Sequence, residues 1–220
     1  MAIALTDRPA VPTGLKVLDL ADFGAAPLAT DPYPYVFARS GLRPEALAPL
    51  RRDFPDLRVA GFHPLEAFKA HGAFIELIED LQGATLAAAM SEKFGLDFTA
   101  LPQFITVRKL SRAHEGRVHN DSESKVASLL LYMNPGWTSP DGHIRVLRNK
   151  DGLEPFVAEL SPEEGNIFAF LRGPNSWHGH TPFVGERRVV QVAWLRDAGE
   201  IKRKQRRHRL SLLLKRIFAA

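Results

Sequence analysis

Three side chains that could together bind a metal ion occur in the second half of the sequence. His119 and Asp121 lie two residues apart, directly before an apolar run, and His178 follows 57 residues after Asp121. In an extended segment, residues i and i+2 point to the same side, so His119 and Asp121 would face one ligand together. Two imidazoles and one carboxylate form the facial triad that holds Fe(II) and leaves coordination positions open. The spacing therefore predicts an iron site.

Two adjacent arginines, Arg187 and Arg188, follow nine and ten residues after His178. An arginine on a neighbouring strand can bind a carboxylate through two hydrogen bonds, which would fix the far end of 2-oxoglutarate. Because successive strand residues point to opposite faces, only one of the two arginines can face the site. An HxD motif, a distal histidine and an arginine in this order are far more specific than HxD alone.

The elements that must position these residues change type along the chain. A strand is predicted at 33–38, a short helix after it with Pro44 in its first turn, and a stronger helix over 73–94, ended by Gly95. From residue 104 onward the sequence consists of short β-like runs separated by turn residues. These runs are FITVRKL, ASLLLYM, HIRVL, FVAEL, NIFAFL and RVVQVAWL. Helices followed by strands indicate a mainly β fold buttressed by helices, with a barrel or sandwich mouth that can hold a ligand.

The composition is that of an ordinary globular domain. The chain has 220 residues, 45% hydrophobic and 25% charged, and no cysteine. Disorder, a disulfide framework and thiolate chemistry are therefore excluded. No run reaches the roughly 18 to 20 apolar residues of a membrane span, and the N-terminus lacks signal-peptide features, so we expect a cytoplasmic protein.

Positive charge is concentrated at the C-terminus. Residues 200–220 carry eight Lys or Arg and one Glu, a net +7, which leaves −3 of the total +4 for residues 1–199. We therefore expect no nucleic-acid substrate for the body of the chain. Within 202–218, leucines share a helical face behind a basic cluster. This pattern fits docking onto the domain or onto a second copy in a homodimer, peripheral contact with an anionic membrane, or binding of nucleic acid or another partner.

Beyond the triad, several motifs carry a family resemblance. LLLYMNPGW (129–137), SPEEGNIFAF (161–170) and WHGHTPFVGERRVVQVAW (177–194) resemble blocks of the Fe(II)/2-oxoglutarate-dependent oxygenases, in their prolyl-4-hydroxylase-like bacterial branch. HIRVL (143–147) matches the strand after a Gly-Gly turn, here Asp-Gly, and 32–55 resembles the upstream strand and helix. The resemblance implies a double-stranded β-helix, or jelly roll. We divide the chain into an N-terminal arm (1–30), an oxygenase domain (31–199, core 103–196) and a basic amphipathic C-terminal helix (200–220).

The resemblance assigns His119, Asp121 and His178 as iron ligands. His178 is preferred over His180 because relatives place a proline four residues after the distal ligand, here at 182. His180 is then a site-lining residue, and the alternative that it is the ligand stays open.

For 2-oxoglutarate, counting back from Trp194 favours Arg188, whereas a Gly-x-Arg pattern favours Arg187; of the two we prefer Arg188. Tyr132 occupies the position of a tyrosine that donates to the same carboxylate. Ile144 and Trp194 are further candidates for lining the site. Three other arginines, Arg108, Arg145 and Arg148, are interpreted as solvated strand residues with a smaller chance of touching substrate.

The implied activity is Fe(II)- and 2-oxoglutarate-dependent hydroxylation, by O₂, of an unactivated C–H bond in a small molecule or cell-envelope precursor. Ascorbate is a candidate stimulant. A peptidyl hydroxylase and a non-catalytic sensor that retains the fold are the alternatives. A zinc or nickel site of cupin type would leave the arginine unexplained.

Overall fold

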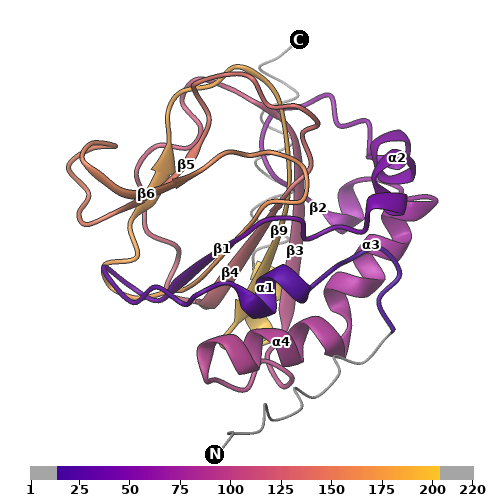
Figure 1. Ribbon diagram of the computed structural model, residues 1–220, viewed down its shortest axis with the longest axis horizontal. Helices are drawn as coiled ribbons and strands as arrows, with labels where there is room; N and C mark the ends of the chain where they lie inside the picture. The colour runs from indigo at the N-terminus through magenta and orange to yellow at the C-terminus, as the bar shows by residue number, and fades with distance from the viewer. Residues whose placement is uncertain (1–13, 204–220) are drawn as a thin grey trace, which may run out of the picture.

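A computed structural model describes residues 14–203, in which nine strands and a small group of helices form one body (Figure 1). The helices are α1 (Ala21–Ala25), α2 (Pro44–Asp53), α3 (Ala73–Gln82) and α4 (Ala84–Phe94), with a short 3₁₀ helix, η1 (Leu65–Ala67). The strands are β1 (Tyr35–Ala38), β2 (His63–Pro64), β3 (Gln103–Ser111), β4 (Lys125–Tyr132), β5 (Ile144–Leu147), β6 (Phe156–Leu160), β7 (Ile167–Leu171), β8 (His178–His180) and β9 (Gly185–Leu195).

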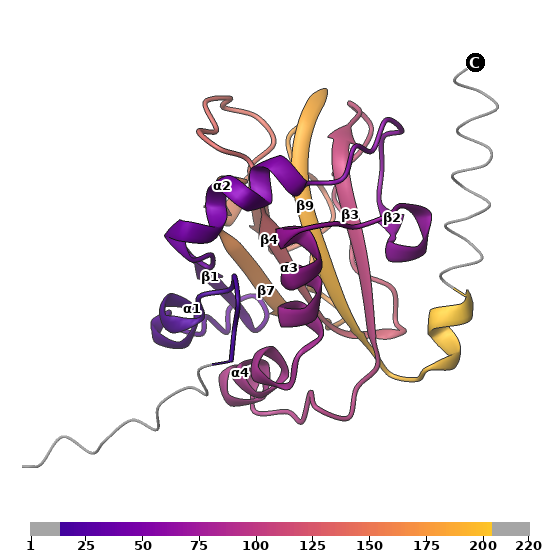
Figure 2. The same cartoon turned by 90° about the vertical axis from the view of Figure 1, so that its right-hand side faces the viewer.

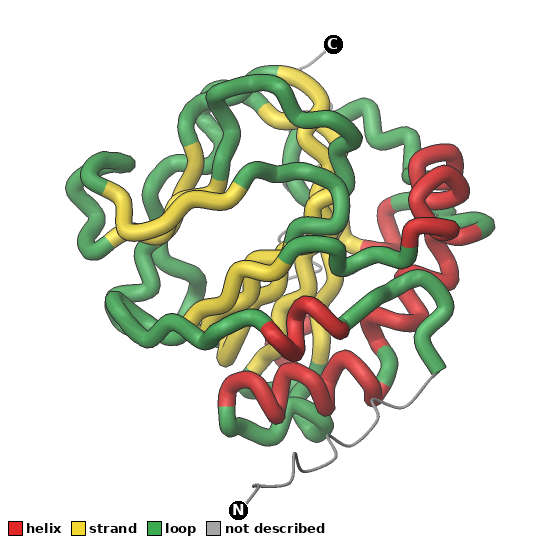
Figure 3. The backbone as a smooth tube through the Cα atoms, viewed as in Figure 1, coloured by secondary structure: helices red, strands yellow, loops and turns green. Residues whose placement is uncertain are grey.

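The strands form two antiparallel sheets. The larger has the order β1-β7-β4-β9-β3-β2, and the smaller has the order β6-β5-β8. Helices α1 to α4 lie across one face of the larger sheet, as Figure 2 shows, and the smaller sheet lies on the other side of it (Figure 3). This arrangement is the expected mainly β jelly roll with buttressing helices. All six predicted strands from residue 104 onward are present, and the short strands β2 and β8 were not predicted.

Strand alternation divides the core into two parts. On β4, Leu129 and Leu131 pack with the helices, whereas Leu130 and Tyr132 belong to a second cluster shared with the smaller sheet. A buried strand of this kind must be apolar on both faces, which is why β4 reads as a nearly continuous apolar run. The space between the two sheets is therefore where a ligand site can form.

The helix predicted over 73–94 is in fact two helices. Gly83 lies between α3 and α4 with an extended backbone (φ −71°, ψ 156°), and its N–H bonds the carbonyl of Asp80. Glycine has a low helix propensity, so the break costs little at this position. The side chain of Asp80 is buried and accepts hydrogen bonds from the backbone N–H groups of residues 16, 17 and 18 at 2.8 to 3.0 Å.

The two ends of the chain differ in how far the structure describes them. Residues 14–30 pack against the domain through Val17, Leu18, Leu20 and Phe23, and Leu18 forms one isolated β-bridge. Residues 199–203 are helical. The rest of the predicted basic helix, like the first 13 residues, lies outside the described part of the chain.

Candidate metal and 2-oxoglutarate site

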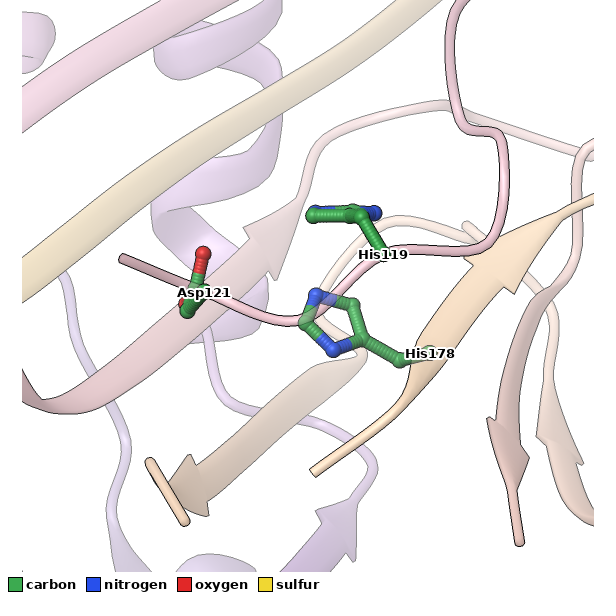
Figure 4. A group of neighbouring side chains, drawn as sticks. All are labelled: His119, Asp121 and His178. Atoms are coloured by element: carbon green, nitrogen blue, oxygen red, sulfur yellow. The ribbon is translucent and has the colours of Figure 1, made fainter. Parts of the chain in front are cut away.

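The structure brings together the three predicted metal ligands. His119 and Asp121 lie on the segment between β3 and β4, and His178 is the first residue of β8 (Figure 4). His119 and His178 face each other in an isolated antiparallel bridge, with N–H to carbonyl distances of 2.9 and 3.1 Å. One ligand atom from each residue lies within 4.8 Å of the other two, close enough for a single metal ion.

Both imidazoles are oriented by backbone carbonyl groups. Nδ1 of His119 lies 2.9 Å from the carbonyl oxygen of Arg117, and Nδ1 of His178 lies 2.9 Å from that of Ser176. A carbonyl oxygen can only accept, so each Nδ1 must carry a proton, and in the neutral ring Nε2 is then the nitrogen with the free lone pair. This is how metal-binding histidines are usually held, and it presents Nε2 to the metal.

Charge and burial fix the protonation states of the buried ligands. Nζ of Lys125 donates to Asp121 at 2.8 Å, and Oγ of Ser128 donates to its other oxygen at 2.7 Å. Burial raises the pKa of Asp121, but Lys125 and His178 outweigh burial and hold that pKa below its ordinary range. Burial and the neighbouring His119 lower the pKa of His178 to about 4. At neutral pH the carboxylate is ionised and the imidazole neutral, as metal binding requires.

A polar residue ties the two ligand-bearing segments together. The Asn120 amide donates to the carbonyl oxygens of Gly173 and Pro174, both at 2.8 Å, and accepts from Oγ of Ser176 at 2.6 Å. Asn120 lies between two ligands, and residues 173–176 form the turn before His178. The amide therefore holds the HxD segment in register with the distal histidine.

The metal ligands open into a cavity of about 320 Å³ between the two sheets. The cavity is lined by Phe62, Arg108, Gly116, His119, Asp121, Lys125, Leu130, Ile144, His178, Gly179, His180, Arg187 and Gln191. Its size suits a small organic ligand.

Arg187 is the arginine that faces this cavity. Its side chain is 1% exposed, and its Nε donates to the carbonyl oxygen of Gly142 at 2.8 Å. Gly142 has φ +82°, and a Cβ there would come within 2.9 Å of Trp137 and 3.4 Å of Nε of Arg187, so glycine is needed for this contact. The guanidinium carbon lies 5.2 Å from the centre of the Tyr132 ring.

The preference for Arg188 as the inward-facing residue was wrong. Arg188 pairs with Glu186, and its guanidinium carbon lies 5.0 Å from the Phe54 ring. Trp194 lies on the same face of β9 as Arg188. It packs in the helix-side core, with its ring centre 5.4 Å from that of Phe98, and does not line the site. Because residues 188 and 194 have the same parity, counting back from Trp194 selected the residue on the wrong face.

The other predicted residues lie close to the expected positions. Ile144 lines the cavity. His180 also lines it but is outside the metal-binding group, and its Nδ1 lies 2.8 Å from the carbonyl oxygen of Thr181. Burial and then Arg187 lower the pKa of His180 to about 3. Tyr132 lies against Arg187 and is fully buried.

Sequence reasoning missed three polar side chains. Lys125 and Ser128, which contact Asp121, had not been assigned to the site, and Arg108 had been taken as solvated although it is only 7% exposed. A polar residue inside a run as apolar as β4 is the signal that could have revealed Ser128. Arg145 and Arg148 pair with carboxylates outside the cavity lining.

The buried polar atoms fit the two groups that such a site would hold. The donor set of two imidazoles and one carboxylate suits Fe(II). Nη2 of Arg187, the hydroxyl of Tyr132 and Nε2 of His180 are buried and have no hydrogen-bond partner among residues 14–203. Buried polar atoms are normally paired, so a carboxylate-bearing ligand would satisfy the two donors, on Arg187 and Tyr132. Nε2 of His180 is an acceptor, because Nδ1 of the same ring donates to the Thr181 carbonyl, and it would need a donor instead.

A jelly roll with a two-histidine, one-carboxylate centre and a buried arginine beside it defines a class of metal-dependent oxygenase. Residues 105–196 match the 2OG-Fe(II) oxygenase superfamily. The match covers the region that holds the site, and the family that it describes is defined by the use of Fe(II) and 2-oxoglutarate.

Solved structures share the fold. A prolyl-4-hydroxylase from Pseudomonas putida is similar at a TM-score of 0.53 and 20% identity, over 74% of this chain and 88% of that one. A viral collagen prolyl hydroxylase from Paramecium Bursaria Chlorella virus-1 gives 0.50 and 14%, over 74% and 96%. A prolyl 4-hydroxylase from Phytophthora capsici gives 0.50 and 15%, over 80% and 60%. A search of curated protein sequences gives no significant match.

Proposed function

We propose that this oxygenase is a hydroxylase that uses His119, Asp121 and His178 to hold Fe(II) and Arg187 to hold 2-oxoglutarate. The observation that carries the proposal is the position of three pre-oriented ligand atoms and a buried guanidinium in one cavity. When bound, Fe(II) and 2-oxoglutarate supply the oxidative chemistry, in which 2-oxoglutarate and O₂ yield succinate and CO₂ and a C–H bond becomes C–OH.

The residues around the metal supply orientation and charge. The carbonyl groups of Arg117 and Ser176 hold both imidazoles in the tautomer that metal binding needs. Lys125 and Ser128 keep Asp121 ionised and fix its rotamer, while each carboxylate oxygen keeps a lone pair for the metal.

The residues at the far end select the co-substrate. The guanidinium of Arg187, fixed by the Gly142 carbonyl, binds the distal carboxylate, and the Tyr132 hydroxyl beside it donates to the same group. Their burial excludes water, which strengthens these charge-assisted hydrogen bonds. Neither side chain moves a proton in this scheme.

A small organic molecule is the substrate class we favour over a peptide. The cavity has the volume of a small-ligand site, and the side chains that line it are largely buried. A non-catalytic protein that retains the fold would have no need to keep a buried arginine beside a complete ligand set.

Within residues 14–203, no helix has the length and apolarity needed to cross a membrane.

The test is 2-oxoglutarate turnover without added substrate. Wild-type protein reconstituted with Fe(II) in air should convert 2-oxoglutarate slowly to succinate, and the Asp121→Ala variant should not. A small-acid library and a peptide library are then compared for stimulation of succinate release. Equal rates in wild-type protein and the variant, with iron bound to the wild type, would contradict the proposal.

A further inference from the structure

A second arginine faces the cavity from a different strand. Arg108 lies on β3, directly opposite Val189 of β9, and is 7% exposed. Its guanidinium carbon lies 4.1 Å from the centre of the Phe62 ring, and Nη2 lies 3.9 Å from Oε2 of Glu115. That ion pair is longer than a hydrogen bond. Nε of Arg108 has no hydrogen-bond partner in the described part of the chain.

Arg108 and Arg187 lie on the neighbouring strands β3 and β9 and are fixed by different parts of the chain. Arg187 is fixed by the Gly142 carbonyl and the Tyr132 ring, next to β4 and the loop before β5. Arg108 is fixed by Phe62, next to β2, and by the loop that carries Glu115. Burial lowers the pKa of Arg108 to about 10, with Glu115 opposing the effect, so the guanidinium is charged at neutral pH. Each of the two guanidinium groups is held in place by its own neighbours, so each can bind an anion of its own.

The formal charges of the site support a second anion. The cavity lining contains three cations, Arg108, Lys125 and Arg187, and one anion, Asp121. Glu115 next to Arg108 reduces the positive excess but does not remove it. Fe(II) carries two positive charges and 2-oxoglutarate two negative charges, so binding both leaves the excess unchanged. Unbalanced buried charge is unfavourable, so a further anion would stabilise the loaded site.

We infer that Arg108 binds an oxyanion of the substrate, so the substrate of this oxygenase is an organic acid with a carboxylate or phosphate group. Both groups match the planar fork of a guanidinium and bind through two parallel hydrogen bonds. This inference rests on the proposed function, because it assigns the distal carboxylate of 2-oxoglutarate to Arg187. Arg145 and Arg148 provide the contrast, since carboxylates of the chain already neutralise them.

The test uses the full chain loaded with Fe(II) and saturating 2-oxoglutarate without oxygen. Visible absorbance is followed while butyrate, its uncharged analogue butyramide, or inorganic phosphate is added. We expect butyrate or phosphate to shift the absorption band saturably without abolishing it, and butyramide to have no effect at equal concentration. Arg108→Met should weaken the acid response about tenfold. The exposed arginine variant Arg148→Met is the matched control and should respond like wild type.

Two further variants guard against a folding artefact. Glu115→Gln removes the competing carboxylate, so it should strengthen the acid response, which damage to the fold would not do. Arg108→Lys keeps the charge and loses the fork, so it should fall between wild type and Arg108→Met.

The outcomes separate this inference from the function on which it rests. If iron binds but wild-type protein gives no band, the proposed function fails and this inference with it. If the band forms, three results overturn the inference alone. They are no response to either acid, equal responses to butyrate and butyramide, and a loss of 2-oxoglutarate affinity in Arg108→Met as large as in an Arg187 variant. That loss of affinity would mean that Arg108 binds 2-oxoglutarate and not the substrate.

Discussion

The two ends of the cavity are built in opposite ways. At the metal end, Nδ1 of each histidine and both oxygens of Asp121 have partners within the chain, and only the atoms that would bind a metal remain. At the other end, atoms of Arg187, His180 and Arg108 are buried with no hydrogen-bond partner among the described residues. The first end is complete in orientation, whereas the second needs a ligand to complete its hydrogen bonds.

This difference says which end depends on the ligand for its stability. A buried polar atom without a partner costs about 1 to 3 kcal/mol, a cost that disappears when a ligand pairs with it. The arginine end is therefore the less stable end without a ligand, and the proposed carboxylate would restore this stability. At the metal end, hydrogen bonds within the chain fix the ligands in advance.

The largest expected effect is at the metal end. Asp121→Ala removes a ligand and leaves the Lys125 ammonium buried without its carboxylate. Iron affinity should fall by more than the roughly 100-fold that loss of an outer hydrogen-bond partner costs, and turnover should become undetectable. Metal content after gel filtration and succinate formation measure this. Asp151→Ala, at an exposed loop position, is the control and should bind iron like wild type. If Asp121→Ala retained iron as well as this control, Asp121 would not be a metal ligand.

Arg187→Met should affect only the other end. Loss of one partner of a buried charge pair costs about 2 kcal/mol or more, so the Kd for 2-oxoglutarate should rise at least about 30-fold. Iron affinity should change little. Arg188→Met is a closely matched control, because it removes the adjacent arginine from the opposite face of β9. If Arg188→Met raised the Kd for 2-oxoglutarate and Arg187→Met did not, Arg187 would not be the arginine that binds 2-oxoglutarate.

The arginine assignment shows where sequence reasoning stopped. The HxD motif and the distal histidine could be predicted, because i, i+2 spacing in an extended segment is a local property. Alternation along β9 puts Arg187 and Gln191 on the cavity side and Val190, Val192 and Trp194 on the helix side. Which of the two faces meets the cavity depends on tertiary packing and has no clear signature in the sequence, and neither does the depth at which Arg108 is buried.

The strands from residue 104 onward could be predicted from the sequence for a different reason. Turn-forming residues separate the predicted strands, so the number and approximate positions of the main strands followed from local chemistry, although β9 begins three residues before the predicted start. β8 contains the residues His-Gly-His and has no apolar pattern at all. It is a strand because its backbone pairs with β5, which is a tertiary effect.

Asn120→Ala should have a smaller effect, again at the metal end. The variant removes the hydrogen bonds from the HxD segment to residues 173–176, so the ligands lose their register. We expect iron affinity to fall about tenfold, the lower part of the range for outer partners of metal ligands. Binding assays with Fe(II) alone measure it. An unchanged iron affinity would show that the backbone bridge between His119 and His178 is sufficient.

Tyr132→Phe should give the smallest effect. It should change the stability of the ligand-free protein and the affinity for 2-oxoglutarate in opposite directions. Removing a buried hydroxyl that lacks a partner should leave the ligand-free protein equally stable or up to about 1 kcal/mol more stable. The same change should weaken 2-oxoglutarate binding several-fold, because a donor to its carboxylate is lost. Thermal unfolding with and without 2-oxoglutarate measures both. A variant that is destabilised and binds 2-oxoglutarate normally would remove Tyr132 from the site.

The most direct test of the account is an anaerobic titration of metal-free protein, first with Fe(II) and then with 2-oxoglutarate, followed by visible absorbance. We expect a weak charge-transfer band that appears only after 2-oxoglutarate is added and is lost in Asp121→Ala. In Arg187→Met the band should need a much higher 2-oxoglutarate concentration than in Arg188→Met. Bound iron that gives no band at saturating 2-oxoglutarate would contradict the central claim that one cavity holds both groups.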